Sequence, residues 1–124
     1  MWLIWLFSCA GLTVNDVTSG ESDAYPELRS IHEAIPRSRA WSRAEAAATS
    51  LWRDCRDTEP FHLECRDDAV FGEATVTVWV ESSGPRVSRV MVRSQTPGRL
   101  GDFGAGRERI LAFQKAFYAS PKTE

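Results

Sequence analysis

The stretch ATVTVWVESSGPRVSRVMVRS, residues 74–94, decides the fold. Its first eight residues alternate apolar and polar side chains, which is the period of a half-buried β-strand. The cluster SSGP at 82–85 is typical of a turn. A further strand is expected over 86–94, with Val90 and Val92 facing inward and Arg89, Met91 and Arg93 on the other side. The stretch therefore predicts two antiparallel strands joined as a hairpin.

Two helices are expected on either side of this hairpin in the chain. Ser42, followed three residues later by Glu45, forms a capping box, in which each side chain satisfies a backbone N–H at a helix start. The Ala-rich run behind it favours a helix, and apolar residues recur on one face as far as Cys55. A helix is therefore expected over 42–55. Apolar residues at helical spacing predict a second helix over 105–119.

The remaining segments complete an α+β domain. A strand is expected over 61–65, and residues 10–40 are expected to form an extended arm rich in Ser, Thr, Asp, Gly and Pro. A further strand from the arm, near 29–36, would extend the sheet. The sequence thus predicts a two-layer sandwich, an antiparallel sheet of three to five strands packed by two helices. Its expected organisation is an apolar segment at 1–9, the arm, and one domain over 41–120.

Length and charge narrow the classes of function. The chain has 124 residues, 43% apolar and 26% charged, as in a single globular domain. Its 15 Lys and Arg against 17 Asp and Glu argue against a dedicated nucleic-acid binder. Residues 1–83 hold 7 basic and 14 acidic side chains, whereas residues 84–124 hold 8 and 3. Either the two parts neutralise each other by packing, or the second presents an arginine patch to anions.

The N-terminus resembles an export signal. Apolar residues 2–7 precede Ser8 and Cys9, and the run LFSC at 6–9 resembles a bacterial lipobox, in which the cysteine is lipidated. The alternatives are the clipped start of a longer export or membrane segment and an apolar N-terminus in a soluble protein. Lipidation of Cys9 would place a bacterial protein in the periplasm or anchored to the cell envelope, with the membrane surface as a partner.

Two further cysteines admit two interpretations. If Cys9 is lipidated, Cys55 and Cys65 remain, and an exported protein can join them in a disulfide. Alternatively, both are buried free thiols. A metal site that adds His62 to this pair lacks the usual ligand spacing, so we expect no metal and no other cofactor.

A glycine-rich run precedes the last expected helix. The segment GRLGDFGAGR, residues 98–107, would present backbone N–H groups at a helix N-terminus, with Arg99 and Arg107 nearby to bind an anion. It has neither the lysine of a P-loop nor the glycine spacing of a dinucleotide fingerprint. The alternative is a flexible turn in which Asp102 serves as a cap or loop staple.

Two segments resemble the family called domain of unknown function 1499, which comprises small bacterial proteins, often exported or membrane-linked, with relatives in plastids. The opening NDVTSG with YPEL, within 15–28, resembles that family's N-D-V-T-T-G and Y-P-x-L. RSQT at 93–96, DFG at 102–104 and RI at 109–110 resemble its ending. The chain differs at Pro97, Arg99 and Gly106, where the family has Arg, Gly and Asn.

The resemblance implies an envelope-associated α+β domain over roughly 14–118, with its functional focus at Arg93, Asp102 and Arg109. It implies no particular activity. An Arg–Asp–Arg cluster that only pins the loop to the helix is the structural alternative.

We therefore weigh two functions. The favoured one is a non-catalytic envelope module that binds a protein partner or a small anionic ligand. The residues expected to bind are Arg93, Arg99, Asp102, Arg107 and Arg109. The alternative is a small hydrolase-like enzyme that uses Asp102 or His62 as its base. The sequence carries no nucleophile motif of the G-x-S-x-G type, which favours the binding module.

Overall fold

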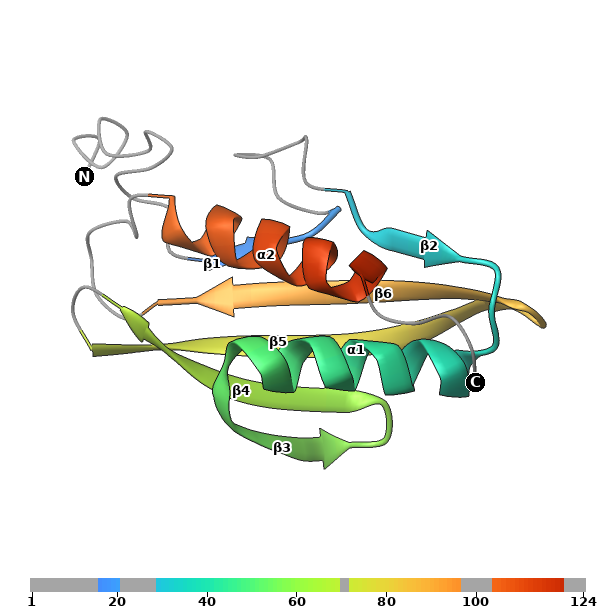
Figure 1. Cartoon of the computed structure of the whole chain (residues 1–124), viewed down its shortest axis with the longest axis horizontal. Helices are drawn as coiled ribbons and strands as arrows, with labels where there is room; N and C mark the ends of the chain where they lie inside the picture. Colours follow the sequence, from blue (N-terminus) through green and yellow to red (C-terminus); the bar gives the residue numbers. More distant parts are fainter. Residues whose placement is uncertain (1–15, 21–28, 70–71, 97–103, 120–124) are drawn as a thin grey trace, which may run out of the picture.

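The computed structural model describes residues 16–20, 29–69, 72–96 and 104–119. These residues form a six-stranded sheet with two helices side by side on one face (Figure 1). The elements, in chain order, are β1 (Asp16–Thr18), β2 (Ile31–Glu33), α1 (Arg37–Leu51), β3 (Arg53–Glu59), β4 (His62–Ala69), β5 (Gly72–Gly84), β6 (Val87–Gln95) and α2 (Ala105–Ala119). The α+β sandwich is confirmed, with one strand more than the upper end of the expected range.

Every strand pair is antiparallel, in the order β1-β6-β5-β4-β3, and β2 also pairs with β6. Strands β1 and β2 lie in tandem along one edge of β6, opposite Arg93–Gln95 and Ser88–Val90 respectively. Ser19 joins them across the gap. Its N–H donates to the Val92 carbonyl at 2.9 Å, and its Oγ accepts from the Val92 N–H at 3.1 Å. The arm therefore supplies one whole edge of the sheet.

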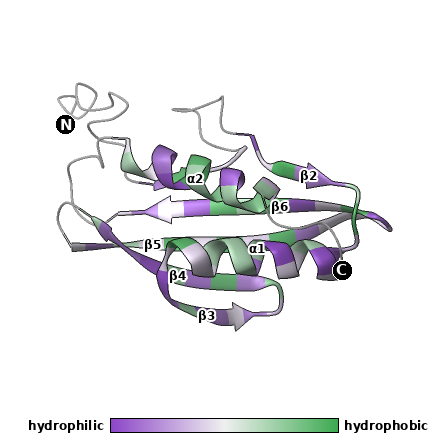
Figure 2. Ribbon diagram, viewed as in Figure 1, coloured by the Kyte–Doolittle hydropathy of each residue, from purple (hydrophilic) through white to green (hydrophobic). Residues whose placement is uncertain are grey.

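The predicted hairpin forms the centre of the sheet. In its register Val78 lies opposite Val92, and Val80 opposite Val90. Their side chains face the helices and are buried, and the middle of β6 is hydrophobic between hydrophilic residues (Figure 2). From the helix layer, Phe113 and other side chains pack against them, with a ring–ring stack on Trp52 at 6.0 Å between centroids. Full burial of a side chain of this size stabilises the fold by roughly 1.5–3 kcal/mol.

The first helix begins earlier than predicted. It starts at Arg37, and Pro36 is its N-cap in extended conformation, with its carbonyl accepting from the N–H groups of Arg39 and Ala40. Ser42 lies inside the helix, where its Oγ donates to the Ser38 carbonyl at 3.2 Å. The capping box is therefore not used, because the proline, with its fixed φ, already supplies the helix start six residues upstream. Helix α1 crosses the expected boundary between arm and domain.

The same helix also ends earlier than predicted, at Leu51, and the chain turns at Trp52 into β3. This strand was not predicted, because its sequence RDCRDTE shows neither apolar alternation nor β-branched enrichment. It exists because it pairs with β4, and its charged side chains protect an exposed sheet edge from pairing with other chains.

A buried arginine fastens the two helices to the arm. The side chain of Arg43, in α1, donates from Nη2 to the Phe117 carbonyl near the end of α2, at 2.9 Å. Its Nη1 lies 3.3 Å from the Glu33 carboxylate of β2, and its guanidinium lies over the Phe117 ring. The position of β2 is thus fixed by its pairing with β6 in the sheet and by the contact of Glu33 with Arg43 in the helix layer.

Candidate functional site

The two segments that carry the family resemblance meet at one corner of the sheet. Strand β1 pairs with the end of β6, and Asp16 forms a two-point ion pair with Arg93, at 2.9 Å from Nε and 2.6 Å from Nη2. Arg93 therefore helps to hold the arm against the sheet. This geometry, two parallel N–H···O bonds, is the strong form of an arginine–carboxylate pair.

Arg109 is committed to the fold. Only 7% of the residue is exposed. Its Nε donates to Asp67 at 2.8 Å, its Nη1 to the Ser94 hydroxyl at 3.2 Å, and its Nη2 to the Asp68 carbonyl at 2.9 Å. These bonds tie α2 to β4 and β6. They correct the assignment of Arg109 to a ligand-binding surface.

Strand geometry also separates the predicted site residues. Successive side chains of a strand point to opposite faces, so Arg93 faces the side away from the helices while Ser94 reaches Arg109 on the helix side. Among the described residues, Arg93 therefore pairs with Asp16, whereas Arg109 pairs with Asp67. At the start of α2, Arg107 pairs with Glu108 at 3.1 Å. The predicted Arg99, Asp102 and Cys9 lie outside the described residues.

Among the described residues, His62 lacks the partners that a catalytic base needs. Its ring stacks on Trp79, with 6.1 Å between centroids, and its Nδ1 lies 3.1 Å from the Pro60 carbonyl. The carboxylate paired with it belongs to Glu59, at 3.9 Å. In the described ranges it has no hydrogen bond to a hydroxyl or thiol that it could activate. Nor do three His, Cys, Asp or Glu side chains gather there as a metal site.

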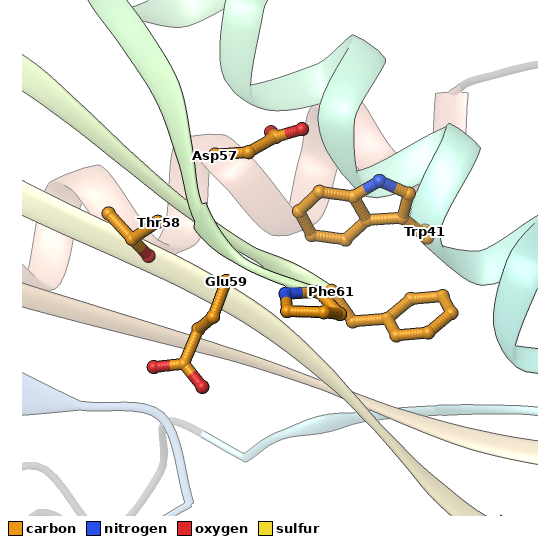
Figure 3. A pocket seen from close by; sticks show the side chains of 6 residues that line it. Trp41, Asp57, Thr58, Glu59 and Phe61 are labelled. Atoms are coloured by element: carbon orange, nitrogen blue, oxygen red, sulfur yellow. The ribbon is translucent and has the colours of Figure 1, made fainter.

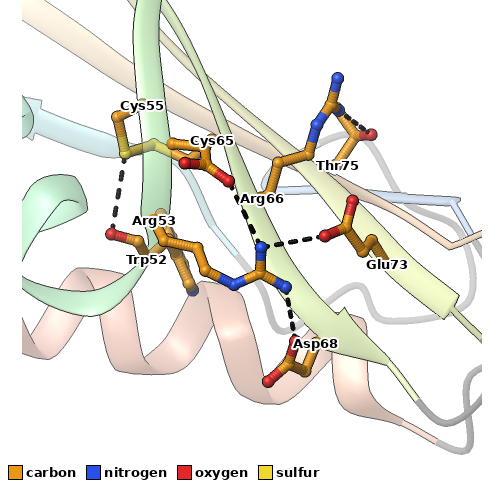
Figure 4. Close-up of polar contacts among 9 residues, drawn as sticks. Trp52, Arg53, Cys55, Cys65, Arg66, Asp68, Glu73 and Thr75 are labelled. Carbon is orange, nitrogen blue, oxygen red and sulfur yellow. Dashed lines mark hydrogen bonds and ion pairs between the residues drawn. A yellow bond between two sulfur atoms is a disulfide. The ribbon is translucent and has the colours of Figure 1, made fainter.

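The edge strand β3 is fastened covalently and by charge (Figure 4). A disulfide joins Cys55 to Cys65 of β4, with 4.0 Å between their Cα atoms. Beside it, Arg53 binds Asp68 and Glu73. These bonds, to Asp68 first and then to Glu73, raise the pKa of the Arg53 guanidinium above its usual range. Arg53 thus joins β3 to β4 and β5 through exposed ion pairs.

A cavity of about 330 Å³ lies where β1 ends and β2 begins. Its lining residues are Gly20, Arg29, Ser30 and His32. Gly20 has φ +77°, and a Cβ there would lie 3.2 Å from the backbone nitrogen and the Oγ of Ser30. The Ser30 hydroxyl accepts from the Nε of Arg89 at 3.1 Å, so one cation already stands behind the cavity wall.

The Arg29 guanidinium of this cavity has no carboxylate partner among the described residues. The side chains of Arg29 and His32 make no hydrogen bond or ion pair with the part of the chain that the structure describes. The Arg29 carbonyl accepts from Gln114 of α2 at 2.6 Å, which fixes its backbone. Arg89 is partly balanced by Glu81, at 3.5 Å. Sequence reasoning missed this cavity, because its residues come from an arm with no periodicity.

No protein-family model and no curated protein matches the chain. Neither helix has the length and apolar character that a bilayer crossing requires.

Proposed function

We propose that the protein is a non-catalytic, exported module that binds a small anionic ligand in the cavity between β1 and β2. The observation that carries this proposal is the guanidinium of Arg29, which borders, together with the ring of His32, a cavity without a described carboxylate to neutralise it. A guanidinium offers forked donors that match carboxylate and phosphate oxygens. The cavity volume of about 330 Å³ lies at the lower end of the range typical of small-molecule sites.

The other predicted arginines support this choice of cavity. Arg93 and Arg107 have carboxylate partners, and Arg109 is buried among protein acceptors. An anion would have to displace those partners, whereas at Arg29 it has no described carboxylate to displace. The cavity is therefore a better candidate for anion binding than the surroundings of Arg93, Arg107 or Arg109.

Calorimetric titration with inorganic phosphate at low ionic strength tests the proposal. We expect saturable binding that weakens as salt is added. Because a hydrogen bond to a charged group contributes about 1.5–3 kcal/mol, Arg29→Ala should weaken binding tenfold or more. Arg39→Ala is the matched control, since Arg39 is an exposed arginine of α1 outside the cavity. Absence of binding, or equal losses in the two variants, would refute the proposed site.

Export is the second part of the proposal. Disulfides persist in oxidising compartments, so the Cys55–Cys65 bridge favours a periplasmic or envelope location, as does the resemblance to domain of unknown function 1499. The intact mass of the protein, taken from the membrane fraction of its host, tests this. Loss of residues 1–8 with acyl groups on Cys9 is the expected result. An unprocessed Met1 with free thiols would overturn it.

A further inference from the structure

A second cavity lies at the opposite edge of the sheet, where the β3–β4 turn meets α1 (Figure 3). Its volume is about 430 Å³. The lining residues are Trp41, Asp57, Thr58, Glu59, Pro60 and Phe61. It shares no residue with the anion cavity beside β2, so the two sites can be tested separately.

Aromatic rings form one wall of this cavity. The rings of Trp41 and Phe61 meet edge to face, with 6.1 Å between centroids. The guanidinium of Arg37 already lies over Phe61, 4.0 Å from the ring centroid, and its Nε donates to the Val80 carbonyl at 3.1 Å. The chain thus covers one aromatic face with its own cation. No described cation covers the indole of Trp41, whose electron-rich face also attracts cations.

The backbone of Phe61, whose ring belongs to this aromatic wall, has an unfavourable conformation. Phe61 has φ +62°, in the left-handed region that bulky residues rarely occupy. It follows Pro60 in the turn, at the place where glycine or asparagine is usual. The Phe61 carbonyl accepts from the Val80 N–H at 3.1 Å, which anchors the turn to β5. Backbone strain of this kind persists where surrounding contacts impose it, and it gathers at binding sites.

A carboxylate without a described partner completes the site. Asp57 points toward the indole of Trp41, whereas Glu59 points away from it (Figure 3). Glu59 lies near His62 on the other face of the sheet, at 3.9 Å. Asp57 makes no hydrogen bond or ion pair with the described residues. One carboxylate beside an aromatic wall suits an organic cation better than a metal ion, which needs several oxygen or nitrogen ligands.

We infer that the cavity between Trp41 and Asp57 binds an organic ammonium group. The ammonium lies over the indole face and pairs with the Asp57 carboxylate, while its alkyl part contacts Pro60 and the edge of Phe61. A free amine and the lysine of a partner protein share this chemistry. The volume of about 430 Å³ admits either.

Titration followed by two-dimensional NMR of the indole N–H groups tests the inference. The probes are choline chloride, butylammonium chloride and the peptide acetyl-Gly-Lys-Gly-amide, each against sodium chloride at equal ionic strength. Trp41→Phe assigns the signal. We expect the organic cations to shift the Trp41 signal saturably and sodium to leave it unchanged. Tighter binding of butylammonium or choline would identify a small organic cation as the ligand, and tighter binding of the peptide a partner's lysine.

Two variants that each remove one carboxylate charge test the role of Asp57. Asp57→Asn should weaken binding at least fivefold, whereas Glu45→Gln, which removes a carboxylate of α1 outside the cavity, should not. Both positions are at least partly exposed, so both variants should fold. An equal response to sodium, no response to any probe, or equal losses in the two variants would overturn the inference. Failure of phosphate binding at Arg29 would leave it intact.

Discussion

Reduction of the Cys55–Cys65 disulfide should lower the free energy of unfolding by a predictable amount. The two cysteines are 10 residues apart, so the bond closes a short loop. In the chain-entropy model, closing a loop of this length in the unfolded state contributes about 2.7 kcal/mol at 25 °C. For 124 residues, an unfolding entropy of roughly 2 cal/mol/K per residue converts this into a fall in Tm of about 10 °C.

The assay is urea unfolding followed by circular dichroism, with and without a phosphine reductant. A Cys9→Ser background prevents thiol exchange, and alkylation followed by intact mass counts the free thiols. Reduction alters no residue other than the two cysteines, so the loss can be assigned to the cross-link. We also expect a larger m value after reduction, because the unfolded chain becomes less compact. Free energies of unfolding that agree within about 0.5 kcal/mol, with two new thiols counted, would refute the reasoning.

Three further perturbations follow from the contacts described above. Gly20→Ala should lower the free energy of unfolding by about 1–2 kcal/mol in urea, because alanine is strained at positive φ and its Cβ would crowd Ser30. Arg109→Ala should cost about 2–4 kcal/mol in the same assay, because it leaves Asp67 and two further acceptors unpaired. Partial burial, and then the charge of Glu33, raise the pKa of Tyr118. Because the folded-state pKa is raised, this contribution to stability is present below the ordinary value, about 10, and is lost as pH rises from there through the raised folded-state pKa. Tyr118→Phe should remove this decline and the high-pH component of the absorbance at 295 nm. An Arg109→Ala variant as stable as wild type, or an unchanged alkaline titration in Tyr118→Phe, would contradict these assignments.

Local patterns in the sequence were sufficient for the parts of the fold that bury a regular face. Alternation over 74–94 predicted the central hairpin, and helical spacing predicted α2 with its bounds. In both cases the side chains that repeat at the right period are those in the core, so the pattern records the burial directly. The α+β class followed from the order of these elements.

Tertiary structure decided the elements and contacts for which the sequence shows no periodic pattern. Strand β3 is almost entirely polar and becomes a strand only by pairing with β4. Because of this pairing, α1 ends at Leu51, one turn before its predicted end. The partners of the arginines likewise depend on which strands become neighbours. The sequence motif suggested one cluster around Arg93 and Arg109, but the folded sheet places the two side chains on opposite faces. The two cavities join residues from separate elements, and no local spacing encodes them. The sequence by itself determined which faces of the chain avoid water, because burial repeats with the period of the backbone. The pairing of charges depends on distances between segments that come together only in the folded chain, so the structure alone decided it.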